Sequence, residues 1–316
     1  MPRILITGAS GLVGRQLCAD LANRGYTVRA AIRRSSPVPV GAAESVAVDD
    51  IGPHTSWREA LRDVDHVIHA AARVHVMNDD PAKNDLYFAT NVEGTRALAN
   101  AAMQARVRRF VFLSSVKVNG EETGDRAYTA HDAPRPQDAY ALSKWQAEQL
   151  LLATCARGNM TCAIVRSPLV YGPGVRANFL RLMSWVDKGY PLPLRAIENR
   201  RSLVSIWNLS QLLELLITTP VVASRIWMVS DGEDLSTSEL IRRLASAMGK
   251  PARLFRVPQS ILRFGARLIG RSEEISRLCG SLRVDSTETR SALGWEPLIS
   301  MDAGLRRTVE WYEANR

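Results

Sequence analysis

The chain has 316 residues, 46% of them hydrophobic, and its 41 Lys and Arg against 32 Asp and Glu give a formal charge of +9. These values exclude a disordered chain and favour an anionic partner: a phosphorylated small molecule, a nucleic acid or an anionic membrane surface. The basic residues are scattered and do not form one run interleaved with aromatic residues, so we expect no nucleic-acid binding.

Short apolar runs and helical patterns alternate along the first half of the chain. Strands are predicted in the β-branched apolar runs at residues 3–9, 27–33, 45–50, 66–72, 109–115 and 162–168. Helices are predicted where apolar residues recur every three or four positions, at residues 11–25, 55–63, 91–107 and 138–158. This alternation predicts an α/β fold, a Rossmann-type doubly wound parallel sheet.

The alternation breaks after residue 166. Pro and Gly cluster in SPLVYGPG and KGYPLPL, IWMVSDG predicts one more strand, and the last 80 residues are mostly helical in pattern. We predict a dinucleotide-binding domain at residues 1–166 with a return at about 203–230. A smaller, interleaved α/β substrate lobe is predicted at residues 167–202 and 231–316.

The segment at residues 254–271, LFRVPQSILRFGARLIGR, is basic and amphipathic. One interpretation is contact with a membrane surface. The interpretation we favour is a helix that docks an apolar face on the core, consisting of Ile261, Leu262, Leu268 and Ile269.

Four cysteines, Cys18, Cys155, Cys162 and Cys279, lie far apart without CxxC spacing or nearby histidines in ligand register. This pattern predicts neither a metal site nor a disulfide framework. The chain opens on the strand-like RILIT, with no signal-peptide pattern, and no window approaches the ~18 apolar residues of a membrane span. We therefore expect a reduced cytoplasmic protein without an integral membrane segment.

The stretch ITGASGLVG follows the first predicted strand and opens the first helix. Glycines at every third position form a variant of the dinucleotide fingerprint, because they permit a tight turn, close phosphate approach and helix packing on the sheet. The N–H groups at the helix N-terminus can bind the pyrophosphate. The residues expected to bind the cofactor here are Gly8, Ser10, Gly11, Leu12, Val13 and Gly14.

The end of the second predicted strand bears on the choice of cofactor. The position where NAD-binding folds carry an acidic residue is Ile32, and Arg33 and Arg34 follow it. Because a guanidinium binds a 2′-phosphate and a carboxylate repels it, this pattern favours NADP, with NAD possible. The alternative is a pair of solvated surface arginines. After the third strand, Asp50 and Ile51 are placed to meet the adenine.

Further motifs occur in order: HAAA at 69–72, NVEGT at 91–95, FLSSVKVNG at 112–120, YALSK at 140–144 and VYGPG at 170–174. With the glycine loop, they make the chain resemble the extended short-chain dehydrogenase/reductase family. The resemblance runs through LGWEP at 293–297, effectively the whole chain. The family contains nucleotide-sugar epimerases, dehydratases and 4-keto reductases.

The resemblance implies that Tyr140 is the general acid/base, that Lys144 is its partner and that the Ser115 hydroxyl holds the substrate oxygen. It also places these residues beside the cofactor: Ala70, Ala71, Ala72, Asn91, Ser114, Tyr140 and Lys144. It places these residues beside a nucleotide-sugar substrate: Ser115, Lys117, Asn178 and Arg201. A homodimer through the helices at residues 91–105 and 140–155 is implied as well.

The physical case for the Tyr140–Lys144 pair rests on charge. A tyrosine pKa is normally near ~10, so ionisation near neutrality needs positive charge nearby. Lys144, one helical turn on, lies on the same face, and an oxidised nicotinamide would add a second charge. Such a phenol can exchange a proton with a carbonyl or alcohol oxygen as hydride moves. On its own, the YxxxK spacing occurs by chance on many solvated helix faces.

Departures from the family motifs bear on the reaction. Arg33 and Arg34 favour a reductase that exchanges NADPH. Val116 and Lys117 stand where dehydratases commonly carry Asp-Glu, and Leu169 stands where UDP-galactose epimerases carry a substrate-contacting Asn.

Several segments (SSVKVNGE, NFLRLM, NRRSLV and VSDGEDLST) are similar to bacterial enzymes of surface-polysaccharide synthesis. These enzymes reduce UDP-4-keto-6-deoxy-N-acetylhexosamines to UDP-N-acetylquinovosamine or its C4 epimer. We predict that NADP-dependent reaction. The first alternative is a UDP-hexose or UDP-N-acetylhexosamine 4-epimerase with tightly bound NAD, and the second is a non-catalytic NADP-binding regulatory protein.

Overall fold

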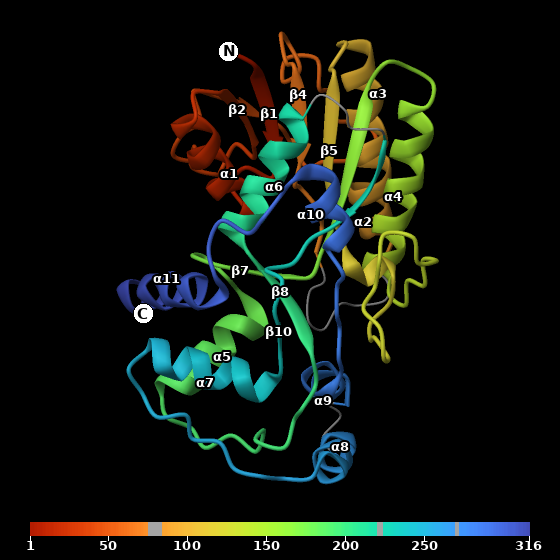
Figure 1. Cartoon of the computed structure of the whole chain (residues 1–316). Helices are drawn as coiled ribbons and strands as arrows, with labels where there is room; N and C mark the ends of the chain where they lie inside the picture. The colour runs from red at the N-terminus through yellow and green to blue at the C-terminus, as the bar shows by residue number, and fades with distance from the viewer. Residues whose placement is uncertain (75–83, 220–223, 269–271) are drawn as a thin grey trace.

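The computed structural model describes residues 1–74, 84–219, 224–268 and 272–316, and the statements below concern these residues. Figure 1 shows the main sheet and its helices above a smaller lobe that carries the C-terminus. No helix within the described ranges is long and apolar enough to cross a membrane. All four cysteines are buried and have free thiols.

The main sheet has parallel strands in the order β3-β2-β1-β4-β5-β6-β9. The strands are β1 (Arg3–Thr7), β2 (Thr27–Ile32), β3 (Glu44–Ala47), β4 (His66–His69), β5 (Arg109–Ser115), β6 (Thr161–Ser167) and β9 (Arg225–Met228). This arrangement confirms the predicted Rossmann-type α/β fold. The strand order reverses between β1 and β4, and ligands of such sheets bind beyond the carboxyl ends of the strands at that point.

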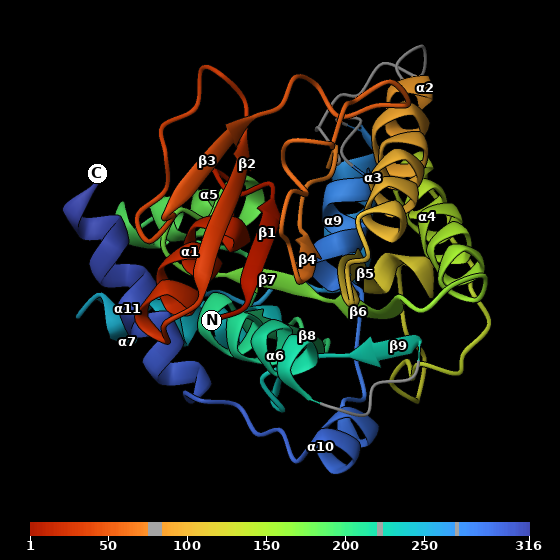
Figure 2. The same cartoon turned by 90° about the horizontal axis from the view of Figure 1, so that it is seen from above.

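Helices cover both faces of the main sheet (Figure 2). One face carries α1 (Leu12–Asn23) and α6 (Ile206–Thr218), and the other carries α3 (Gly94–Gln104) and α4 (Ala139–Cys155). Side chains alternate along each strand, so Ile4 and Ile6 pack under α1 and α6 while Leu5 packs under α3 and α4. Burial on both faces explains the continuous apolar runs in the sequence.

The smaller lobe is built on a three-stranded sheet in the order β10-β8-β7. Its strands are β7 (Leu169–Tyr171), β8 (Arg201–Ser205) and β10 (Asp234–Leu235). Its helices are α5 (Ala177–Asp187), α7 (Thr237–Ala247), α8 (Gln259–Leu268), α9 (Ser272–Cys279) and α11 (Met301–Ala314). Buried side chains from α5, α7, α11 and the strands form its own apolar core.

The chain passes between the lobes more than once. After β8, helix α6 packs on α1, and β9 joins the main sheet beside β6. Helix α10 (Thr287–Leu293) contacts β9, and Trp295 is buried in the core under α1 and α6. The segments that build the two lobes thus alternate along the chain. The domain boundaries at residues 166, 203 and 230 stay predictions.

The helix predicted at residues 55–63 is wrong. These residues form turns, and Asp63 has a φ of 57°. The carbonyls of Ala60 and Arg62 accept hydrogen bonds of 3.1 and 2.6 Å from Arg29 Nη1. Trp57 is 2% exposed and belongs to the core beneath α3 and α4. Hydrogen bonds from Arg29 of β2 therefore replace the regular backbone hydrogen bonds that a helix would form here.

The predicted docking of the α8 face on the core is also wrong in part. Ile261 is 59% exposed, whereas Leu262 packs against the core of the smaller lobe. The side chain of Leu268 and the whole of Ile269 lie outside the described residues.

Candidate active site

The loop between β1 and α1 leaves no room for a side chain at Gly8 or Gly14. Gly8 has a φ of 68°, and a Cβ there would lie 2.7 Å from the backbone N of Ala71. A Cβ on Gly14 would lie 2.2 Å from the carbonyl oxygen of Gly8. Both distances are shorter than van der Waals contact, so the loop conformation requires glycine at these positions.

The start of α1 is open to an anion. Gly11 is the N-cap residue, no side chain caps the helix, and its first turn contains no acidic residue. The N–H groups of this turn, with the positive end of the helix dipole, suit a pyrophosphate. The loop therefore fits the phosphates of a dinucleotide, as predicted for this stretch.

The end of β2 carries two exposed ion pairs. Arg33 Nε lies 3.3 Å from Asp50 Oδ1, and Arg34 Nε lies 3.6 Å from Asp49 Oδ1. A 2′-phosphate bound here would therefore meet two carboxylates as well as two guanidiniums. Nearby, Ile51 packs so closely on the start of α3 that a Cβ at Gly94 would lie 2.5 Å from Ile51 Cγ2.

A buried hydrogen-bonded chain begins behind the glycine loop. Thr7 Oγ1 lies 2.6 Å from His69 Nδ1, and His69 Nε2 lies 3.0 Å from Thr95 Oγ1. The Thr95 hydroxyl donates to the carbonyl of Asn91 at 2.7 Å, so it must accept from His69 Nε2–H. His69 Nδ1 then accepts from Thr7, whose oxygen also receives the N–H of Ala71 at 3.3 Å. These contacts fix the neutral Nε2–H tautomer, and burial and the charge of Lys144 lower the pKa of His69 to about 3.

Asn91 continues this chain of hydrogen bonds to α4. It lies in a π-helical turn, η2 (Phe88–Glu93), which follows the short helix α2 (Asn84–Tyr87). Its amide donates to Ser143 Oγ at 2.9 Å, and Ser143 Oγ donates to the carbonyl of Tyr140 at 2.8 Å. Its amide also exchanges hydrogen bonds of 2.8 and 3.0 Å with the backbone of Arg73. Asn91 thus joins the cofactor loop region to α4.

Ser115 and Tyr140 meet at the carboxyl end of β5. Ser115 ends the strand and caps a 3₁₀ turn, η3 (Val116–Val118), and its side chain hydrogen-bonds to the Tyr140 hydroxyl. Asp138 caps α4 by accepting from Ala141 N at 2.7 Å, which fixes the helix start next to Tyr140. Burial raises the pKa of Tyr140 to about 12, and the hydrogen bond from Ser115 opposes this rise.

Lys144 is buried one helical turn from Tyr140 and is 2% exposed. Burial lowers its pKa to about 7, while the charge of Glu148 acts in the opposite direction. Its Nζ lies 3.9 Å from the centre of the Phe112 ring, which stacks on His69 at 5.5 Å. An ammonium held here stabilises a nearby phenolate, as the predicted role requires.

Ser114, which was predicted to lie beside the cofactor, directs its hydroxyl to a residue of α4. It is 3% exposed, and its hydroxyl donates to Glu148 Oε1 at 2.5 Å. Glu148 forms a fully buried ion pair with Arg166, whose Nη2 lies 2.6 Å from Glu148 Oε2, and Arg166 Nη1 donates to Asn119 Oδ1 at 3.1 Å. This cluster ties α4, which carries Tyr140 and Lys144, to β5 and β6.

Glu148 and Arg166 were not among the residues predicted from the sequence. The available signals were an arginine inside the apolar run CAIVRSP and a glutamate four residues after Lys144.

Three residues predicted to bind substrate, Lys117, Asn178 and Arg201, each have a partner within the protein. Lys117 Nζ lies 2.7 Å from both Asp138 Oδ2 and Glu121 Oε1, so two carboxylates hold it at the start of α4. Asn178 is exposed in the first turn of α5 and accepts from Arg181 Nη2 at 3.1 Å. Arg201 in β8 donates to the carbonyl of Gly280 at 3.1 Å. Their substrate roles stay predictions.

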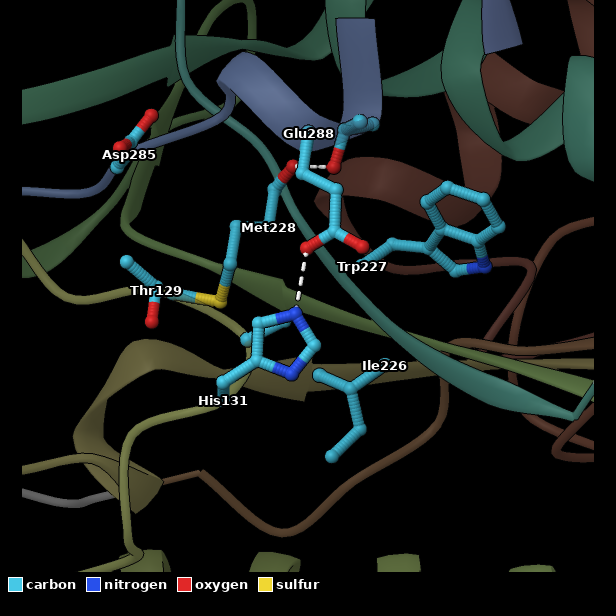
Figure 3. A pocket seen from close by; sticks show the side chains of 9 residues that line it. Thr129, His131, Ile226, Trp227, Met228, Asp285 and Glu288 are labelled. Atoms are coloured by element: carbon cyan, nitrogen blue, oxygen red, sulfur yellow. Dashed lines mark hydrogen bonds and ion pairs between the residues drawn. The ribbon is translucent and has the colours of Figure 1, made fainter. Parts of the chain in front are cut away.

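Figure 3 shows a separate pocket between β9 and α10. His131 Nε2 lies 2.9 Å from Glu288 Oε2 at its mouth, and Trp227 and Met228 form part of its wall. Its volume of about 90 Å³ is too small for a dinucleotide or a nucleotide sugar. The candidate active site is therefore the edge at β1, β4 and β5.

Comparison with known proteins agrees with this geometry. The family model described as the NAD dependent epimerase/dehydratase family matches residues 4–230. A UDP-glucose 4-epimerase of Vibrio cholerae is 41% identical, covering 98% of this chain and 95% of that protein. A 3-beta-hydroxysteroid dehydrogenase of Mycolicibacterium neoaurum is 27% identical, covering 98% and 91%. The solved structure of MoeE5 in complex with UDP-glucose and NAD is 27% identical, with a TM-score of 0.79 and 99% coverage of both chains.

The family match spans most of the chain and includes the glycine loop, Asn91, Ser115, Tyr140 and Lys144. The Vibrio relative extends the likeness over nearly the full length of both proteins. The resemblance inferred from the motifs is therefore confirmed: the chain belongs to the NAD dependent epimerase/dehydratase family.

Proposed function

We propose that the protein is a 4-epimerase of a UDP-hexose or UDP-N-acetylhexosamine that works with bound NAD. The observation that carries the proposal is the 41% identity to a UDP-glucose 4-epimerase over nearly the whole of both chains, with Ser115, Tyr140 and Lys144 all present. The likeness to MoeE5, solved with UDP-glucose and NAD, supports the same substrate class. The 4-reductase prediction has weaker support than this alternative.

The site geometry supports a proton transfer that runs in both directions. When NAD is bound, its nicotinamide carbon supplies the hydride acceptor. The Tyr140 phenolate would take the proton of the sugar C4 hydroxyl when that carbon is oxidised, and the resulting phenol would return the proton to the C4 oxygen when the carbon is reduced on its opposite face. Ser115 would hydrogen-bond the same oxygen, and the Lys144 ammonium would stabilise the Tyr140 phenolate, which is present before the proton is taken and forms again when the proton is returned. The sum of both steps is an isomerisation with no net change in the cofactor.

The cofactor proposal rests on the two ion pairs at the end of β2. The pairing of Arg33 with Asp50 and Arg34 with Asp49 offsets the positive charge that favoured NADP in the sequence. A ribose with a free 2′-hydroxyl carries no charge for these carboxylates to repel. We therefore propose NAD in place of the predicted NADP.

A second candidate is the NADP-dependent reduction of a UDP-4-keto-6-deoxy-N-acetylhexosamine. The observation in its favour is Leu169 at the start of β7, where UDP-galactose epimerases carry an Asn. This side chain is 46% exposed and offers no hydrogen bond to a sugar hydroxyl. We regard the regulatory, non-catalytic alternative as less favoured, because the hydrogen bond between Ser115 and Tyr140 is present and Lys144 is buried beside them.

The purified protein tests the proposal. We expect nucleotide released by denaturation to be NAD, and we expect UDP-glucose or UDP-N-acetylglucosamine to be converted to its C4 epimer without added cofactor. The matched assay supplies NADPH with a UDP-4-keto-6-deoxy-N-acetylhexosamine. Stoichiometric NADPH consumption there, with no epimerisation of either UDP-sugar, would establish the reductase and overturn the proposal.

We also propose a cytoplasmic homodimer that pairs through α3 and α4, as the resemblance implied, with a role in surface-polysaccharide synthesis. A light-scattering mass of one chain would contradict the dimer.

A further inference from the structure

One edge of the smaller lobe exposes a group of large apolar side chains. Tyr190 is 50% exposed, Phe255 47%, Ile261 59% and Phe264 65%. These are four of the eleven large hydrophobic side chains that are exposed in the described ranges, and they come from only two stretches of sequence. Single exposed apolar residues are common on protein surfaces, but a cluster marks a contact site.

The two stretches lie side by side. Leu192 N donates to the carbonyl of Arg253 at 2.8 Å, and Phe255 N donates to the carbonyl of Leu192 at 3.1 Å. Leu192 and Leu254 pack into the core of the lobe. Because side chains alternate along an extended segment, Arg253 and Phe255 then point outward. Figure 1 shows both stretches along the lower rim of the lobe, at the end away from the main sheet, where one stretch leads up into β8 and the other leads into α8.

Helix α8 continues this rim with an apolar face. Ile261 and Phe264 are three residues apart and therefore share one side of the helix. Leu262 packs against the core of the lobe, whereas Ile261 and Phe264 are exposed to solvent. Ile261, which was predicted to dock on the core, is thus exposed beside Phe264, which was not part of the predicted face.

The same rim is strongly basic. Residues 250–268 contain five basic residues and no acidic one. Lys250 pairs with Asp187, whereas the side chains of Arg253, Arg256 and Arg267 are exposed. Arg195, whose backbone N–H donates to the carbonyl of Phe255 at 3.2 Å, adds another exposed guanidinium. On the neighbouring stretch, Glu198 is exposed, and the exposed Arg200 follows it two residues later.

We propose that this rim docks on the surface of an anionic lipid bilayer. The rim is defined by Tyr190, Arg195, Arg253, Phe255, Arg256, Ile261, Phe264 and Arg267. Aromatic and aliphatic side chains enter the headgroup region while guanidiniums contact lipid phosphates, as in interfacial amphipathic helices. A protein partner would need a complementary acidic face, and a second copy of this rim would repel the first by its charge. The proposal does not depend on the reaction catalysed.

Vesicle sedimentation of the full-length protein tests the proposal. The probes are vesicles of phosphatidylcholine alone and vesicles with one third phosphatidylglycerol. We expect the protein to pellet with the anionic vesicles only, and we expect 1 M salt to release it because the Debye length falls from ~10 Å to ~3 Å. The double variant Ile261→Asp with Phe264→Asp should weaken this partitioning by at least about tenfold.

The matched control is Val40→Asp with Leu298→Asp, two apolar residues that are 85% and 58% exposed away from the rim. This control should bind vesicles as the parent protein does, and both double variants should keep the parent's thermal midpoint because all four positions are exposed. Equal pelleting with and without vesicles would overturn the proposal. An equal loss of vesicle binding in the rim variant and the control variant would also overturn it. The same holds if the rim variant changes the light-scattering mass but binds vesicles as the parent protein does.

Discussion

Glu148 and Arg166 form an ion pair with no solvent exposure behind Ser115, Tyr140 and Lys144. Glu148→Gln keeps the shape of the side chain and removes the charge, so the Arg166 guanidinium is left buried and uncompensated. Breaking a buried pair from one side typically costs about 3–5 kcal/mol. We predict that the free energy of unfolding falls by this amount.

The companion variant replaces both members, Glu148→Gln with Arg166→Met. No charge is then left unpaired, and the amide oxygen of the introduced glutamine can still accept the hydrogen bond from Ser114. The Asn119 side chain loses one donor, which typically costs about 1–3 kcal/mol for a buried polar group. We therefore expect the double variant to be more stable than Glu148→Gln alone.

The assay is urea unfolding of the parent, both single variants and the double variant, which gives the coupling energy of the pair. The control is Glu93→Gln, which breaks the exposed pair of Glu93 with Arg96 and should cost less than about 1 kcal/mol. Additive losses in the double variant, or a cost for Glu148→Gln no larger than that of the control, would refute the reasoning.

Three further predictions concern Tyr140, the glycine loop and His69. Tyr140→Phe should lower kcat by about 10²–10⁴-fold while NAD binding, followed by fluorescence titration, stays close to that of the parent protein. Substantial residual turnover would remove Tyr140 from its proposed role. Gly14→Ala should abolish NAD binding, because the new Cβ would lie 2.2 Å from the Gly8 carbonyl oxygen, whereas Gly124→Ala, where a Cβ meets nothing within 4 Å, should bind NAD normally. The pKa of His69 in the folded protein is about 3, below its ordinary value of 6.5. Between these pH values the unfolded chain binds a proton on His69 that the folded protein does not bind. The free energy of unfolding therefore decreases as the pH falls through this window. The loss of unfolding free energy caused by His69 should reach about 3 kcal/mol near pH ~4.5. The urea midpoint of His69→Gln should therefore decrease less steeply with falling pH than that of the parent protein. The same pH dependence in both proteins would contradict a buried, neutral His69.

Much of the fold could be predicted because its signals are local. A strand buried on both faces is an apolar run whatever its partners are, and the glycine loop is specified by backbone conformation within a few residues. The turns at residues 55–63 could not be predicted in this way. Their apolar spacing fits a helix, but Arg29, some thirty residues earlier, takes the carbonyls of Ala60 and Arg62. A contact between distant residues thus overrides the local pattern.

Helix α8 shows a second limit of prediction from the sequence. Its apolar spacing predicts a buried face, yet periodicity records only that a face is apolar and not what covers it. Ile261 and Phe264 remain in solvent because the core of the smaller lobe is already closed by α5, α7 and α11. The sequence thus identifies the amphipathic segment, and the structure is needed to show which surface it leaves open.

The two serines at the end of β5 show how the site could have been predicted more closely. Phe110 and Phe112 pack under α4, and Ser114 follows at the same two-residue spacing, so strand alternation directs its side chain toward α4. A buried hydroxyl there needs a partner on that helix, and Glu148 is the carboxylate that accepts it. A buried carboxylate in turn needs a cation, which the arginine in the apolar strand β6 supplies. The pairing of Glu148 with Arg166 therefore follows from alternation and charge compensation, whereas the meeting of Ser115 with Tyr140 depends on how β5 and α4 are placed in the fold.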